Sequence, residues 1–144
     1  MRGRVTVALV VVGLVLSSVA AALAAEQAKV PEIPGVTIQD PKPNGCNDCH
    51  RKVSPEKDYT LRTEIANMVK AGTHPKVSER LLQDLPKQCV TCHKPDSKQP
   101  FGEVLHKAHL VGGAENHFIT AYQGQCMYCH SLDPGTGSMK VKGL

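Results

Sequence analysis

The chain contains three copies of one pattern, as Cys46-Asn47-Asp48-Cys49-His50, Cys89-Val90-Thr91-Cys92-His93 and Cys126-Met127-Tyr128-Cys129-His130. The three copies use all six cysteines of the 144-residue sequence, and a histidine directly follows every second cysteine. The pattern therefore predicts one kind of site, made of two cysteines and one histidine, that occurs three times in the fold.

The spacing within each copy suits covalent attachment of a haem. Two thiols three positions apart lie about one turn of chain apart, so both can form thioethers with the vinyl groups on one edge of a porphyrin. The histidine that follows then lies under the iron as its proximal ligand. The sequence predicts three haem c groups, attached at Cys46, Cys49, Cys89, Cys92, Cys126 and Cys129 and ligated by His50, His93 and His130.

Other uses of six cysteines explain the pattern less well. A zinc ribbon needs two Cys-x-x-Cys knuckles for each metal, so three knuckles would leave one without a partner. Six cysteines could form disulfides in 15 ways, but none of them requires a histidine beside each pair. A thioredoxin-like redox pair usually occurs once, ahead of a helix in a βαβ unit, and the sequence has no such pattern.

Four histidines remain after the proximal ones are assigned: His74, His106, His109 and His117. We expect three of them to be the distal ligands of the three irons. Methionine is the competing distal ligand and would raise the reduction potential. Met68 and Met127 are interpreted as packing residues and Met139 lies near the C-terminus, so bis-histidine ligation is the expectation.

The segment His106-Lys107-Ala108-His109 carries two of these histidines three positions apart. On a helix this spacing puts both rings on one side, with Cβ atoms about 5 to 6 Å apart. The rings are then too close to serve one iron well, but they suit two irons if they diverge.

The N-terminus is typical of an exported protein. A basic start, Met1-Arg2-Gly3-Arg4, precedes an almost unbroken apolar run from Val5 to Ala25. We interpret residues 1–24 as a secretory signal peptide, with an uncleaved N-terminal anchor as the alternative. The protein is then periplasmic or extracellular, which agrees with haem attachment outside the bacterial cytoplasm.

Beyond the signal, residues 25–45 are rich in proline and are expected to form an extended linker, residues 46–133 a single domain, and residues 134–144 a flexible tail. Apolar periodicity and stop signals predict short helices over 60–70, 78–85, 103–110 and 115–122. No segment shows the alternation of a strand. The expected fold is mainly α with extensive loops and little or no sheet, in which short helices surround three covalently bound haems. Because aromatic and other large apolar residues are few, the apoprotein is expected to be largely unfolded.

The three Cys-x-x-Cys-His units and the His106–His109 segment together resemble the small class III multihaem cytochromes. These include trihaem proteins of periplasmic electron transfer in sulfate and metal reducers, that is, in anaerobic respiration. The resemblance implies that His106 and His109 ligate different irons and that His74 or His117 serves the third. In that family, however, the His-Lys-x-His segment precedes the first cysteine pair, whereas here it follows the second. The family's haem order is therefore not carried over.

Irons with two histidine ligands have no open position for a substrate, so outer-sphere electron transfer at low potential is the expected function. The expected partners are redox proteins such as membrane or periplasmic oxidoreductases, or further copies in an oligomer or filament. The alternatives are a small haem reductase with one open iron, and a trihaem subunit of a membrane oxidoreductase or of an extracellular cytochrome filament. The formal charge of +4 falls to +2 without Arg2 and Arg4. Haem propionates would offset this surplus, so no nucleic-acid site is expected.

Overall fold

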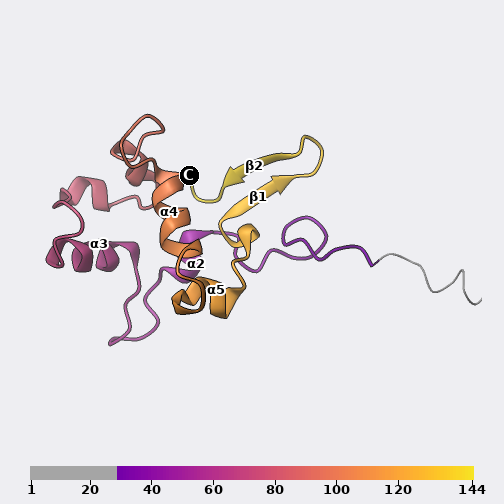
Figure 1. Cartoon of the computed structure of the whole chain (residues 1–144), viewed down its shortest axis with the longest axis horizontal. Coiled ribbons are helices and arrows are strands. Elements are labelled where there is room, and N and C mark those ends of the chain that lie inside the picture. The colour runs from indigo at the N-terminus through magenta and orange to yellow at the C-terminus, as the bar shows by residue number, and fades with distance from the viewer. Residues whose placement is uncertain (1–28) are drawn as a thin grey trace, which may run out of the picture. The chain divides into compact units, whose positions relative to one another are not determined.

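A computed structural model describes residues 29–144 (Figure 1). The predicted signal peptide or anchor at residues 1–24 lies outside these residues. Residues Glu32–Leu144 form one compact unit, which contains all three cysteine motifs. Within the described residues, no helix has the length and apolar character needed to cross a membrane.

Short helices and loops make up most of this unit (Figure 1). The α-helices are α2 (Cys46–Cys49), α3 (Leu61–Lys70), α4 (Phe101–Leu110) and α5 (His117–Tyr122). The 3-10 turns are η1 (Glu79–Leu82), η2 (Lys87–Thr91), η3 (Gly113–Glu115) and η4 (Cys126–Tyr128). Two antiparallel strands, β1 (His130–Asp133) and β2 (Ser138–Val141), form the sheet. The expectation of a mainly α fold with extensive loops and little sheet is confirmed.

Side-chain caps and glycines set several of the helix ends. The hydroxyl of Thr60 accepts a hydrogen bond from the backbone N–H of Thr63 and caps α3, and the side chain of Asn116 caps α5 in the same way at Phe118. After α4, Gly112 and Gly113 both have positive φ, which reverses the chain between α4 and α5. The two helices then pack against each other (Figure 1).

The helix expected at 78–85 is shorter than its pattern suggested. Only Glu79–Leu82 is helical, as a 3-10 turn, and Ser78 makes no capping hydrogen bond through its side chain. Pro86 accounts for the loss of the last turn, because it has no N–H to donate to the carbonyl of Leu82 and disfavours the α conformation of Leu85.

The C-terminal segment differs from the expected flexible tail. Residues 138–141 return antiparallel to β1, with Ser131 opposite Lys140 and Leu132 opposite Met139. Asp133 closes the connecting turn, because its side chain accepts from the N–H of Gly135 and its carbonyl from that of Gly137. Turn signals in 133–137 therefore mark a hairpin.

The segment 25–45 also differs, in part, from an extended linker. From Glu32 onward it belongs to the same compact unit as the motifs, and a tight turn closes over residues 33–38 on the carbonyl oxygen of Ile33. Residues 40–45 lie against the C-terminal segment through Lys142, as described below.

The apolar core of the unit is very small. Met127 is the one large apolar side chain that is buried among the described residues, and ten other large apolar side chains are strongly exposed. A chain of this size normally needs far more buried apolar area to be stable. The composition and the packing therefore both favour a bulky apolar cofactor as part of the core.

Candidate functional site

Each cysteine motif folds as a single turn. Helix α2 holds the first motif, and the N–H of His50 donates to the carbonyl of Cys46 over 2.7 Å. The second motif repeats this bond between His93 and Cys89 over 2.9 Å, and the third lies on η4. This turn puts two thiols and one imidazole of each motif within reach of one cofactor. All six cysteines are free thiols, as thioether formation requires.

The structure pairs each motif histidine with one histidine from elsewhere in the chain. The ring centroids are 6.1 Å apart for His50 and His109, 6.1 Å for His93 and His74, and 6.0 Å for His130 and His106. Two segments of chain, α4 and the turn after α3, thus bring a second imidazole to each of the three motifs.

This separation is the one that a six-coordinate iron requires. An imidazole nitrogen lies about 2 Å from a metal that it ligates, so rings on opposite sides of one iron have centroids about 6 Å apart. Directly stacked rings would be closer. The three pairs therefore fit an iron between their rings. By contrast, among residues 29–144 no three His, Cys, Asp or Glu side chains converge on a point where a single metal ion could bind, as a zinc ribbon would need.

Backbone carbonyls orient several of these rings through Nδ1. His50 donates to Tyr59 over 3.1 Å, His93 to Gln99 over 2.8 Å, and His109 to Leu105 over 2.9 Å. The Nδ1 of His74 likewise donates to the carbonyl of Pro75 over 2.7 Å. Because a carbonyl oxygen only accepts, Nδ1 carries the proton and the lone pair is left on Nε2. Hydrogen bonds of this kind fix the tautomer and orientation of metal-ligating histidines.

Burial favours the neutral form of two motif histidines. It lowers the pKa of His50, with a smaller opposing effect of the hydrogen bond to Tyr59. It also lowers the pKa of His130, where His106 and the positive charge of Lys142 act in the same direction. A neutral imidazole is the form that can donate a lone pair to iron.

Helix α4 carries two of the three distal candidates. His106 faces His130 and His109 faces His50, so the two rings diverge toward different motifs. The third candidate, His74, lies in the turn after α3 and faces His93. The ring of His117 faces Tyr122 instead, with centroids 5.6 Å apart. Of the two histidines that the sequence left open, the structure brings His74 to a motif.

The methionines agree only in part with the interpretation of Met68 and Met127 as packing residues. Met127 is buried, whereas Met68 and Met139 are exposed. Aromatic rings extend the surroundings of His109, since Phe118 lies edge-on to it at 5.4 Å and Tyr122 connects Phe118 to Tyr128. Three of the five aromatic residues, Phe118, Tyr122 and Tyr128, thus form a chain of rings from His109 to the third motif.

The first motif lies close to both of the others. Burial raises the pKa of the Cys46 thiol, and the nearby thiols Cys89 and Cys49 act in the same direction. Burial also raises the pKa of Cys129, with added effects from Cys46 and Cys49. The side chain of Asn47 donates to the carbonyl of Leu85 over 3.3 Å, which fastens the first motif to the segment before the second. The attachment points are therefore clustered around Cys46.

Lys142 is a further residue of the site, and no sequence pattern indicated it. Its side chain is 5% exposed, and its Nζ lies 2.5 Å from Oδ2 of Asp40. The ammonium also donates to the carbonyl of Met127 over 2.6 Å and to that of Lys42 over 3.0 Å. The three hydrogens of the ammonium thus each have an acceptor. This contact, which we call the Lys142 clasp, joins Asp40 and Lys42 of the N-terminal segment to the third motif.

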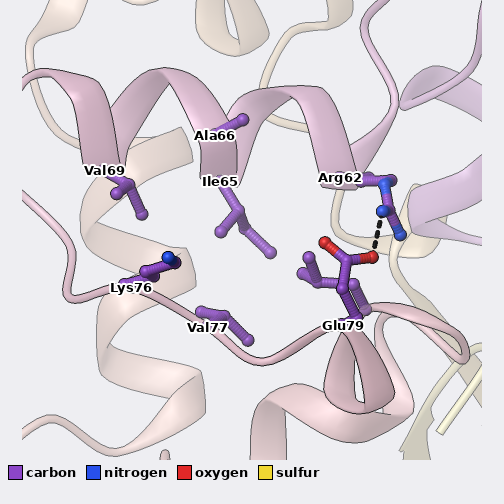
Figure 2. Close-up of a pocket in the computed structure, with 8 residues that line it drawn as sticks. Arg62, Ile65, Ala66, Val69, Lys76, Val77 and Glu79 are labelled. Atoms are coloured by element: carbon purple, nitrogen blue, oxygen red, sulfur yellow. Dashed lines mark hydrogen bonds and ion pairs between the residues drawn. The ribbon is translucent and has the colours of Figure 1, made fainter.

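A cleft of about 340 Å³ opens between α3 and the segment that follows His74 (Figure 2). Ile65 and Val69 project into it from α3, and Val77 from the facing segment. Arg62 and Glu79 form an ion pair at one end, and Lys76 adds a second cation. His74 does not line this cleft, so the cleft provides apolar surface near the second pair but no ligand.

Comparison with known proteins agrees with this site. The family described as cytochrome c7 and related cytochrome c matches residues 36–131, which is two thirds of the chain and includes all three motifs. No curated protein sequence and no solved structure matches the chain. Members of this family are multihaem electron-transfer proteins that hold haem c through Cys-x-x-Cys-His motifs. The chain belongs to the family of cytochrome c7 and related cytochromes c.

Proposed function

We propose that this protein is a trihaem cytochrome in which every iron has two histidine ligands and which transfers electrons at low potential. The single observation that carries the proposal is the pairing of each motif histidine with one other histidine at about 6 Å. The proposed axial pairs are His50 with His109, His93 with His74, and His130 with His106.

The chain's own residues would hold the haems in a defined way. Each cysteine pair would anchor one porphyrin edge, and the carbonyls bonded to Nδ1 would keep the Nε2 lone pairs directed at the irons. The haems supply reversible one-electron chemistry when bound. Histidine as the second ligand, with no methionine in that position, supports a low potential.

An enzymatic reading is not favoured by this arrangement. A reductase needs an iron with an open position, but each motif histidine here already faces a second imidazole. We infer that the protein is an electron carrier without a catalytic site of its own.

We further propose that it is exported to the periplasm or the outer surface, as the apolar run of residues 5–25 suggests. Its partners would be membrane or periplasmic oxidoreductases, or copies of itself in an oligomer or filament.

The ligand assignment can be tested with matched histidine variants. Intact-mass measurement should first show three covalent haems, and low-temperature EPR of the oxidised protein should show low-spin iron alone. We expect His74→Gln to convert one haem to high spin while retaining all three. His117→Gln is the matched control and should leave the spectrum unchanged. High-spin iron in the unmodified protein, or a spin change in His117→Gln and not in His74→Gln, would contradict the assignment.

A further inference from the structure

A buried positive charge lies directly against the third motif. The ammonium of Lys142 donates to the carbonyl of Met127, inside that motif, over 2.6 Å. The backbone N–H of the same lysine donates to the carbonyl of Cys129 over 2.9 Å. Two bonds thus hold Lys142 beside the two residues that flank Tyr128. Because the side chain is 5% exposed, water screens this charge poorly.

The counter-ion of this ammonium makes no hydrogen bond to the third motif within residues 29–144. Asp40 comes from the N-terminal segment, and its side chain is 21% exposed. Its carboxylate is therefore better hydrated than the ammonium, and it also accepts from the backbone N–H of Lys42. The ion pair consequently acts on the third motif as a dipole whose positive end is the nearer and the less screened.

The ammonium makes no hydrogen bond to the first or the second motif, although the stem of Lys142 lies beside Gly45, which precedes the first motif. Among residues 29–144, Lys142 is the one buried side chain that carries a charge. The cations near the second histidine pair, Arg62 and Lys76, are both exposed. Exposed charges are screened by water and salt, so their effect on a nearby cofactor is small.

We propose that the Lys142–Asp40 pair raises the reduction potential of the haem ligated by His130 and has a much smaller effect on the other two haems. This rests on the proposed function, since it requires a haem at each motif. Reduction transfers one electron from a redox-partner protein, which is oxidised by one electron, and lowers the charge of the iron by one. The positive charge of Lys142 repels the ferrous form less than the ferric form, so it favours reduction. The pair thereby makes the third haem easier to reduce than it would be without Lys142.

Opposite charge changes at the two ends of the pair provide the test. In holoprotein, Lys142→Met should make reduction of the third haem about tenfold less favourable, which corresponds to about 59 mV for one electron. Asp40→Asn should shift the same haem in the opposite direction. Lys142→Arg keeps the charge and should retain most of the original potential. The matched control is Lys140→Met, which removes an exposed charge from the same end of the chain and should produce a much smaller shift.

Potentiometric titration monitored by NMR would measure each potential, with the third haem assigned from its contacts to Tyr128. If Lys142→Met folds poorly, Asp40→Asn against Lys140→Met still decides the question. Shifts in the same direction for Lys142→Met and Asp40→Asn would overturn the proposal, as would a shift confined to another haem or one no larger than that of Lys140→Met. Counting haems by mass in each variant keeps this result separate from the proposed function, which fails if fewer than three haems are attached to the unmodified protein.

Discussion

The Lys142 clasp should contribute a large part of the stability of this small-cored protein. We consider the variant Lys142→Ala. It removes the donor to the carbonyls of Met127 and Lys42 and leaves Asp40 without its cation. Removing one member of a buried ion pair typically destabilises a protein by about 3 to 5 kcal/mol.

The exposure of Asp40 places this protein at the lower end of that range. At 21% exposure, water can rehydrate part of the carboxylate once the ammonium is gone. We therefore expect the free energy of unfolding to fall by about 3 kcal/mol. For a domain of this length, the melting temperature should drop by about 10 °C.

Guanidinium chloride unfolding of the holoprotein, followed by far-UV circular dichroism, would measure this change. Lys140→Ala is the matched control, because its exposed side chain should contribute no more than about 0.5 kcal/mol. A double-mutant cycle of Lys142→Ala with Asp40→Asn should show strong coupling between the two side chains. A loss below about 1 kcal/mol for Lys142→Ala, or an equal loss for Lys140→Ala, would refute this reasoning.

Three further predictions concern the same structure. Gly45→Ala should destabilise the holoprotein by about 2 kcal/mol or more in the same unfolding assay, because φ is +60° at this position and an added Cβ would lie 2.8 Å from Cβ of Lys142. A free energy of unfolding equal to that of the unmodified protein would contradict this close approach. Burial would raise the pKa of Asp40, but the hydrogen bonds and charge of Lys142 and the backbone of Lys42 bring it below 3.8. The clasp should therefore be at full strength above pH 3.8 and should weaken as the pH falls through the lower pKa of the folded state. Asp40→Asn should remove this part of the acid sensitivity, and identical acid titration curves for the two proteins would contradict the prediction. A chain made without haem attachment should show little helical circular dichroism, because Met127 is the one large apolar side chain buried among the described residues, and a cooperative melting transition of that apoprotein would argue the reverse.

The chemistry-bearing part of the site could be predicted from the sequence to a large extent. The Cys-x-x-Cys-His spacing predicts the attachment points, because it follows from the size of one turn and one porphyrin edge, and the family match spans all three motifs. The spacing of His106 and His109 indicated diverging rings, and the structure directs them to different motifs. Helix α3 also follows from local signals, since its apolar spacing and its Thr60 cap act within one segment.

Contacts between distant segments had no such local signal. His74 follows one predicted helix and His117 lies within another, and no local pattern separates them as ligands. Only the turn after α3 brings His74 to His93. The ammonium of Lys142 reaches the carbonyl of Lys42 across 100 positions of sequence. The hairpin of β1 and β2 is an intermediate case, because Pro134, Gly135 and Gly137 were interpreted as signs of a loose tail although the same residue types form tight turns.

The placement of two distal histidines on one ten-residue helix has a mechanical consequence. Because His106 and His109 are fixed to the same rigid rod, a rotation or tilt of α4 displaces both rings at once. Any partner that docks on α4 would therefore act on two of the histidine pairs together. It would reach the pair of His74 and His93 only through the hydrogen bond from the N–H of Phe101, at the start of α4, to the carbonyl of His93. Two of the three histidine pairs are thus mechanically linked to each other more directly than either is to the third.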